Sequence, residues 1–381
     1  MRATPRAPTL VSVWVVLATL LCLGCSEGPP VHESAEAPEH PSGMPVFERH
    51  TLSISDADLA EDGYWPLGVS DEGRIVYVAS KAEAPMFRVL DSTGRKLDAF
   101  GRLGDGPGEF RSPLGLQVRG DSIQIFDDGR MTLLRYSWEG RPLGEVRSLI
   151  LDIPLAWLAD SLDHWVPPGM TRMERSVLRR TQIGDSAGRT LIAENDSGFQ
   201  HILRSTPGGR RLMRLPYAVG PSQIYLADAF NYQIYRYDST GRLLARFGRA
   251  LGPHHRGPKE ISKLRRMITG RGNPPASGRA WLDTLDRDVT EHFNPSGFQL
   301  DKVGRLWIVG LANDSTTIDV FSDTTFLGRA VVPCFLVQGG SPVAISTHWL
   351  LLECELHDSA DLTSELHLYH IVQPRRPPYG R

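Results

Sequence analysis

The stretch FGRLGDGPGEFRSPLGLQVRGDSIQIFDDGRMTLLRYSWEG, residues 100–140, contains one complete copy of the unit that decides the fold. After a glycine-rich loop, an opening follows that consists of proline, any residue, a small residue and an apolar residue. Two apolar runs separated by a turn complete the unit. The same opening occurs at six places, beginning at Pro66, Pro113, Pro154, Pro216, Pro295 and Pro342. Six copies of the opening indicate six repeats.

The repeats have the composition of short β-strands joined by tight turns. Runs rich in β-forming residues are separated by glycine, aspartate and serine. One turn recurs as DSTG at 91–94 and 238–241, as DSAG at 185–188 and more loosely as SWEG at 137–140, and glycine suits the positive φ of such hairpins. The final glycines lie 46, 48 and 53 residues apart. Four strands at this period predict an all-β fold, a six-bladed β-propeller with four-stranded antiparallel blades.

The six openings are expected to form the innermost strands of the blades. A small residue there lets backbones approach near the central axis, and the apolar residue after it packs between blades. The last repeat contains only three strand-like runs, at 343–345, 349–354 and 366–372. We expect Phe47–Ile54 to supply its fourth strand, which would close the ring between the two ends of the domain.

The amino-terminal region predicts export. Residues 1–24 contain Arg2, Arg6 and the apolar stretch Leu10–Leu23, which is short for a bilayer span and is typical of a secretory signal. Without this signal the net charge is −4, which gives no indication of nucleic-acid binding. Residues 25–45 include five prolines and predict a disordered tether. The propeller is then expected at 46–372 and a flexible tail at 373–381.

The sequence LCLGC at 21–25 resembles the bacterial lipobox. The resemblance implies that Cys25 is acylated and becomes the first residue of the mature chain, and several acyl chains would anchor it firmly in a membrane. Ser26 after this cysteine favours the outer membrane, facing the periplasm or the cell surface. An ordinary cleaved signal or a membrane helix is the alternative.

Two more cysteines of the mature chain, Cys334 and Cys354, are both expected in the last repeat, where neighbouring strands could bring them together. In an oxidising compartment such a pair predicts a disulfide. Two buried free thiols are the alternative. Two cysteines alone make a poor metal site, so we predict no metal here.

Residues 223–241, QIYLADAFNYQIYRYDSTG, resemble an NHL repeat, in which a strand, Asp, two residues and Asn precede a second strand and an Asp turn ending in Gly. Residues 104–110, followed by Pro113, are similar to the linker between such repeats. The chain therefore resembles the bacterial six-bladed propeller lipoproteins with NHL-like repeats. This resemblance implies the fold and does not imply one activity.

Residues 249–292 interrupt the repeats between the fourth and fifth blades. The part at 249–279 contains eight Lys or Arg and one acid, Glu260, so its net charge is +7. Apolar residues at 261, 264 and 268 predict a short helix, and those at 282–293 predict a second one. We interpret the segment as a partly helical insertion that attracts an anionic ligand. The candidate ligand-binding residues are Arg172, Arg175, His254, His255, Arg256, Lys259, Lys263, Arg265 and Arg266. A solvated packing insertion is the alternative.

The sequence contains no pattern that identifies catalytic residues. Calcium-dependent propeller hydrolases need several oxygen ligands at the axis, but the expected inner strands contain no Asp or Glu and only Gln117 and Gln299 as amides. Asp127, Asp128 and Asp228 could bind calcium or act as bases, although in the NHL-like pattern we expect such an Asp to brace its loop through backbone hydrogen bonds. The adjacent residues His254 and His255 are not expected to meet at one ion.

These observations predict a monomeric, lipid-anchored binding protein of the cell envelope, without catalytic activity or cofactor. A partner protein or an anionic glycan is the expected ligand, and no nucleic acid is expected. A metal-dependent hydrolase or lyase of the six-bladed propeller type is the alternative.

Overall fold

The computed structural model describes most of the repeats. The described residues are 31–34, 44–54, 67–79, 85–147, 153–157, 161–165, 176–182, 189–193, 195–205, 216–220, 222–269, 279, 282–312, 315–336, 343–355 and 364–372. The predicted signal at 1–24, Cys25 and the tail at 373–381 lie outside this set. Among the described residues, no helix is both long and apolar enough to cross a membrane.

Five antiparallel sheets of four strands account for most of the described chain. The first contains β3 (Leu67–Val69), β4 (Ile75–Val78), β5 (Phe87–Leu90) and β6 (Lys96–Phe100). The second contains β9 (Pro113–Arg119), β10 (Ser122–Asp127), β11 (Thr132–Ser137) and β12 (Pro142–Arg147). The third contains β13 (Ile153–Trp157), β14 (Ser161–Trp165), β15 (Ser176–Gln182) and β16 (Arg189–Ala193). The remaining two are β23 (Phe293–Leu300), β24 (Arg305–Ala312), β25 (Ser315–Ser322) and β26 (Thr325–Val332), and β27 (Val343–Ile345), β28 (Trp349–Glu355), β29 (Ser364–Val372) and β2 (Val46–His50).

A further sheet has five strands. It contains β17 (Tyr217–Val219), β18 (Gln223–Asp228), β19 (Gln233–Asp238) and β20 (Leu243–Arg249), and β1 (Val31–Ser34) is added in parallel at the outer edge of β20. The prediction of a disordered tether at 25–45 is therefore wrong for Val31–Ser34. Sequence pattern gives little sign of such a strand, because an open sheet edge recruits a polar peptide through main-chain hydrogen bonds.

Short elements fill the connections between these sheets. They are β7 (Arg102–Leu103) and β8 (Glu109–Phe110), the 3₁₀ helix η3 (Asp128–Arg130), helix α2 (Ser197–Ser205), β21 (His254–His255), helix α3 (Pro258–Thr269) and β22 (Val289–Thr290). The second helix predicted at 282–293 is wrong at its end, because β22 and the start of β23 occupy those positions. The β-branched Val289 and Thr290 instead pair with β21.

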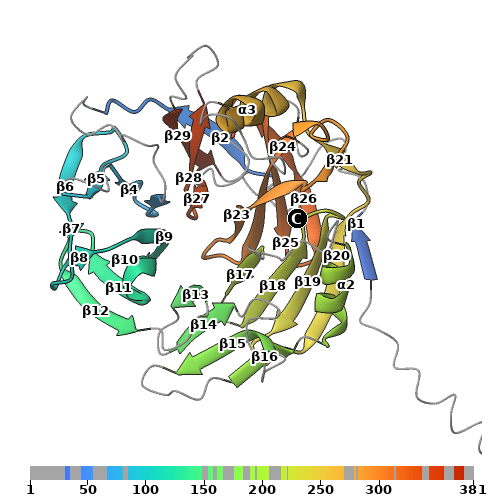
Figure 1. Cartoon of the computed structure of the whole chain (residues 1–381), viewed down its shortest axis with the longest axis horizontal. Coiled ribbons are helices and arrows are strands. Elements are labelled where there is room, and N and C mark those ends of the chain that lie inside the picture. The colour runs from blue at the N-terminus through green and yellow to red at the C-terminus, as the bar shows by residue number, and fades with distance from the viewer. Residues whose placement is uncertain are drawn as a thin grey trace, which may run out of the picture.

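The sheets are arranged around a centre as the blades of a propeller, with β9, β13, β17, β23 and β27 nearest the middle (Figure 1). All six Pro-x-small-apolar openings lie in or directly before these inner strands or β3, which confirms that part of the prediction. The ring closes as expected, because β2 from the amino-terminal side pairs antiparallel with β29 from the carboxyl-terminal side.

The apolar core lies between neighbouring blades rather than at the centre of one sheet. One cluster joins Val76 and Phe87 of the first sheet to Ile123 and Tyr136 of the second. Comparable clusters link the sheet of β23–β26 to the sheet of β27–β29, and the latter to the first sheet. The small residue of the opening has the expected role at Gly68, where a Cβ would lie 2.6 Å from Leu116 Cδ2. Contact between blades therefore selects the small residue at this position.

Candidate functional site

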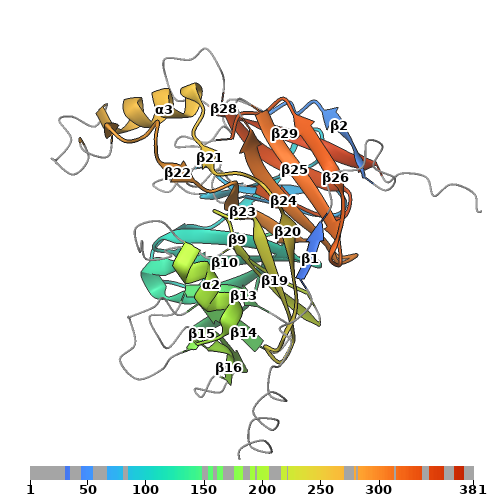
Figure 2. The same cartoon turned by 90° about the vertical axis from the view of Figure 1, so that its right-hand side faces the viewer.

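The segment between β20 and β23 projects from the ring. The strands β21 and β22 form a two-stranded antiparallel ribbon, and α3 lies between them in the chain. Figure 2 shows α3 extending outward from the sheets, with the ribbon between α3 and the body of the molecule. The ribbon is held on the ring by the N–H of His292, which donates to the Ala229 carbonyl at 2.8 Å.

An ionic network around the buried Asp319 lies at the junction of two blades. The Asp319 carboxylate of β25 accepts hydrogen bonds from Arg329 Nε at 2.6 Å and Nη2 at 2.8 Å, from Arg249 Nη1 at 3.0 Å, and from the Tyr232 hydroxyl. The Asp319 side chain is only 1% exposed. Burial, together with the neighbouring Asp319 charge, raises the pKa of the Tyr232 phenol well above its usual value. Because Tyr232 and Arg249 come from one sheet and Asp319 and Arg329 from the next, the network holds the base of the projecting segment to both.

Asp127 and Asp228 end equivalent strands and both accept backbone N–H groups, as the sequence predicted, but only Asp228 braces its own loop, whereas Asp127 holds the loop before β9. Asp127 accepts the backbone N–H groups of residues 111–112 at 2.9 and 2.7 Å. Asp228 accepts those of residues 230–231 at 3.0 and 3.3 Å, and its second oxygen accepts Asn231 Nδ2 at 2.8 Å. Both carboxylates thus satisfy backbone donors that the loops would otherwise leave without partners.

The residue four positions after each bracing aspartate has a positive φ. Met131 has φ 50° and Tyr232 has φ 52°, a conformation that is uncommon for residues other than glycine. The repeat therefore imposes the same loop geometry twice. In the second loop, this conformation places the Tyr232 hydroxyl within hydrogen-bond distance of Asp319. The loop therefore also connects two neighbouring blades.

The adjacent residues His254 and His255 diverge. His255 is exposed, whereas the ring of His254 lies against that of His292, with centroids 5.3 Å apart. Burial lowers the pKa of His292 to about 4, and the neighbouring His254 contributes to this. Sequence reasoning did not identify His292, which is 38 positions from His254 and reaches it only because β21 and β22 pair.

Arg256, another predicted ligand-binding residue, forms an ion pair inside the protein. Its Nε lies 3.3 Å from Glu260 Oε1, and the two side chains are 9% and 5% exposed. Burial raises the pKa of the Glu260 carboxyl to about 7, while the Arg256 charge opposes that shift. The sequence contains a signal for this pair, because Glu260 is the single acid of a basic segment and follows Arg256 by four positions.

The remaining predicted cations are distributed over the surface of α3. Lys259, Arg265 and Arg266 are exposed. Lys259 and Arg266 are seven residues apart, which places them two helical turns and about 10 Å apart on one face. The side chain of Lys263 and the whole of Arg172 and Arg175 lie outside the described residues.

Gln299, one of the two amides expected near the axis, links two blades. Its Nε2 donates to the carbonyls of Ser296 and Val343 at 2.7 and 2.6 Å, and its Oε1 accepts the N–H of Ile345 at 3.2 Å. Both ends of the amide are therefore engaged with the backbone of β23 and β27. Its role is to join neighbouring inner strands.

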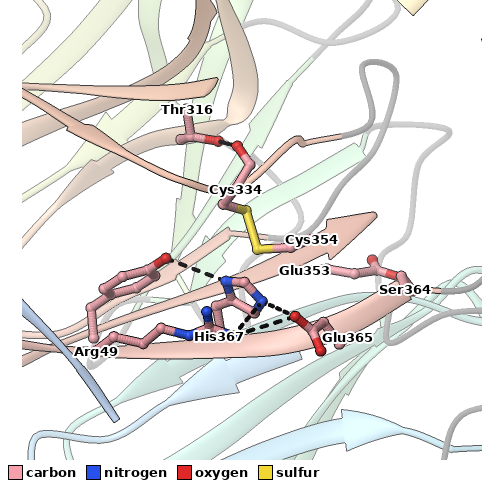
Figure 3. Close-up of a disulfide and its surroundings, with 9 residues drawn as sticks. Arg49, Thr316, Cys334, Glu353, Cys354, Ser364, Glu365 and His367 are labelled. Atoms are coloured by element: carbon pink, nitrogen blue, oxygen red, sulfur yellow. Dashed lines mark hydrogen bonds and ion pairs between the residues drawn. A yellow bond between two sulfur atoms is a disulfide. The ribbon is translucent and has the colours of Figure 1, made fainter. Parts of the chain in front are cut away.

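The predicted disulfide between Cys334 and Cys354 is present and joins the segment after β26 to β28 (Figure 3). His367 of β29 lies beside it, and the two sulfurs and one imidazole nitrogen are all within 4.8 Å of one another. The Nε2 of His367 contacts Glu365 Oε1 and lies 2.9 Å from Arg49 Nη2. The sequence predicted the disulfide but not the histidine beside it.

Comparisons with known proteins support the fold. No protein-family model and no curated protein matches the chain. Among solved structures, a protein described as exported, from Bacteroides fragilis, aligns with a TM-score of 0.52 and 12% identity over 91% of this chain and 99% of its own. A member of the DUF4221 family from Bacteroides vulgatus aligns with a TM-score of 0.50 and 9% identity over 87% of this chain and 98% of its own. At these identities the likeness concerns the fold alone.

Proposed function

We propose that this protein is a non-catalytic binding propeller of the cell envelope, anchored by lipid on Cys25, and that it binds an anionic envelope polymer on the exposed side of α3. The observation that carries the proposal is the distribution of charge in the projecting segment. The pairs Arg249–Asp319 and Arg256–Glu260 are internal. Lys259, Arg265 and Arg266 are exposed on a helix that extends from the ring.

This division of charges gives each part of the segment a separate role. The Arg249–Asp319 pair holds the base of the segment to two blades, whereas the Arg256–Glu260 pair lies within the segment and buries the sole acid of residues 249–279. The outer surface therefore keeps a positive charge within a mature chain of net charge −4. A local positive surface on a negative protein attracts polyanions, and the cations two turns apart suit a polymer with repeated negative groups.

We also propose that the ring has six blades of the NHL-like type. The five-stranded sheet differs from the four-stranded ones only by the added strand β1, so it counts as one more blade. The hydrogen bonds of Asp228 with residues 230–231 agree with the NHL pattern of Asp and Asn in this loop. The similarity to a protein described as exported agrees with an envelope location.

The binding proposal is tested by replacing the three exposed cations together. In the variant Lys259→Gln/Arg265→Gln/Arg266→Gln, affinity for polygalacturonate, a linear polycarboxylate, should fall about tenfold, because exposed ion pairs contribute roughly 0.5 kcal/mol each. Isothermal titration calorimetry at low salt measures this, with neutral dextran as the negative probe. Binding of the unaltered protein should also weaken as salt increases.

A matched control changes the same charge elsewhere. Arg95, Arg141 and Arg242 are exposed and follow the glycines of three equivalent hairpin turns. Changing all three to glutamine should alter the affinity less than twofold. Equal losses in the two triple variants, or no binding by the unaltered protein, would contradict the proposed site. Binding of an acidic protein but not of the polymer would assign the surface to a protein partner instead.

The lipid anchor has a separate test. Mass spectrometry of the membrane-extracted protein should give a mature chain that begins at Cys25 and carries acyl groups. The variant Cys25→Ser should leave the membrane fraction, because the acyl chains provide the attachment. A variant that stays in the membrane fraction would rule out this anchor.

A further inference from the structure

The disulfide lies beside His367, a residue type that binds metal ions together with cysteine. Cys354 pairs with Glu365 across β28 and β29, and His367 is two residues further along β29. Successive residues of a strand alternate between its faces, so these three side chains lie on the same face of the sheet. Cys334 approaches that face from the end of the neighbouring blade (Figure 3). Two sulfurs and an imidazole therefore lie together at a junction between blades, and the Glu365 carboxylate contacts the imidazole.

We propose that reduction of the Cys334–Cys354 disulfide creates a site for a thiophilic divalent cation, zinc, with both thiolates and the imidazole of His367 as ligands. Glu365 contacts the Nε2 of His367 and would have to rotate toward the sulfurs to become a fourth ligand. This zinc site lies at β28 and β29 and is independent of the anion-binding surface proposed on α3.

The distances fit such a site with small movements. The three donor atoms lie within 4.8 Å of one another, and all three residues are buried. Zinc bonds of about 2.3 Å to sulfur and about 2.0 Å to nitrogen in a tetrahedral site place ligand atoms roughly 3.5–4 Å apart. Opening the S–S bond separates the sulfurs, which is the change that this geometry requires. Glu365 is 43% exposed, so the fourth position would lie toward solvent.

Arg49 opposes the metal. Its Nη2 donates to Glu365 Oε1 at 3.3 Å and lies 2.9 Å from His367 Nε2. A bound cation must displace this guanidinium or approach the other ring nitrogen, which is 3.3 Å from the Tyr369 hydroxyl. Removing the Arg49 charge should therefore strengthen metal binding, an effect that a nonspecific surface site would not produce.

The redox step requires a partner of defined class. A dithiol reductant transfers two electrons to the disulfide, its own two thiols become a disulfide, and its two protons pass to the sulfurs of Cys334 and Cys354. Zinc then binds both sulfurs as thiolates and displaces these two protons. In the oxidised chain the two sulfurs are bonded to each other and neither is a thiolate, so the site is absent. The cluster thus links the two blades covalently in one redox state and through a metal in the other.

The test uses cobalt(II) as a spectroscopic substitute for zinc in the mature chain with Cys25→Ser, which removes the remaining thiol. After reduction with a dithiol and removal of the excess, one equivalent of cobalt should produce thiolate-to-cobalt charge-transfer bands and tetrahedral visible bands. Oxidised protein should produce neither. Zinc should displace the cobalt and abolish both sets of bands.

Two variants assign the ligands. His367→Gln should weaken cobalt binding at least about tenfold, because changes even to groups around a metal ligand cost that much. Arg49→Gln should strengthen it. No cobalt binding by the reduced protein, or equal binding by His367→Gln, would overturn the proposal. Circular dichroism monitors folding throughout, and loss of structure on reduction that metal does not reverse would also overturn it.

Discussion

The hairpin turns and the base of the projecting segment both pair arginine with a carboxylate, but they do so in different surroundings. In the turns, Asp91 accepts hydrogen bonds from Thr93 and from Arg95, whose side chain is 76% exposed. At the base of the segment, Asp319 is 1% exposed and is shared by two arginines and a tyrosine. An exposed pair contributes little to stability, whereas removing one partner of a buried pair leaves an uncompensated charge.

The hairpin turns and helix α3, whose first turn contains Glu260, should respond to pH with opposite sign. Hydrogen bonds from Thr93 and Arg95 lower the pKa of Asp91 to about 2, so its contribution to stability exists above its ordinary pKa and is lost in acid. Burial raises the pKa of Glu260 to about 7, so its contribution is greatest below its ordinary pKa of 4.5 and is lost as pH rises. Burial of Glu260 therefore reverses the direction in which pH acts on it, relative to Asp91.

The largest expected effect concerns Asp319. The substitution Asp319→Ala should lower the free energy of unfolding by about 3–5 kcal/mol, because it leaves the partly buried Arg249 and Arg329 without their carboxylate. Urea denaturation at neutral pH measures this. The control Asp91→Ala should lower the free energy by less than about 1 kcal/mol. Similar losses in the two variants would remove the distinction between the regions.

The next effect is the pH dependence due to Glu260. Between pH 4.5 and 7, the unfolding free energy of the unaltered protein should fall relative to that of Glu260→Gln, by about 2 kcal/mol. The fall arises because the unfolded state releases the proton near pH 4.5 and the folded state holds it to about pH 7. Urea titrations of both proteins at several pH values give the difference. A difference that does not change with pH would mean that burial does not perturb Glu260.

A smaller effect is expected at Tyr232. Tyr232→Phe keeps the ring but removes the hydroxyl that donates to Asp319, so the unfolding free energy should fall by about 1–2 kcal/mol. Tyr237→Phe is a useful comparison. The Tyr237 hydroxyl donates to Asp196, between β16 and α2, at 2.7 Å, and not to Asp319. Double-mutant cycles with Asp319→Ala should show strong coupling for Tyr232 and none for Tyr237. Equal coupling would mean that the network does not act as a unit.

The smallest effect belongs to the turns. Between pH 4 and 2, the unaltered protein should lose stability relative to Asp91→Asn by less than about 1 kcal/mol, because Asp91 is near the surface and solvent weakens its interactions. Denaturation at the two pH values tests this. A loss as large as that for Glu260, or one of opposite sign, would contradict the assignment by burial.

The local features of the fold could be predicted from the sequence. The openings at Pro66 and Pro113 gave the positions of the inner strands, and the runs around Phe47 and Ile371 indicated closure of the ring. The bracing role of Asp228 followed from its place in the repeat. Strand alternation, turn residues and repeat period act over a few positions, so they can be read directly.

The candidate site depended on contacts that no local pattern contains. Asp319 meets Arg249, which is 70 residues away, because their blades are neighbours, and His367 meets a disulfide because of strand register. The basic composition at 249–279 indicated a candidate segment for binding anions. Only the packing of the segment decided that Arg256 is internal while Arg265 is exposed. The sequence by itself thus determined the repeat, the turns and the location of the insertion. Only the tertiary structure decided which charges are internal and which face solvent, because desolvation and pairing depend on which surfaces meet.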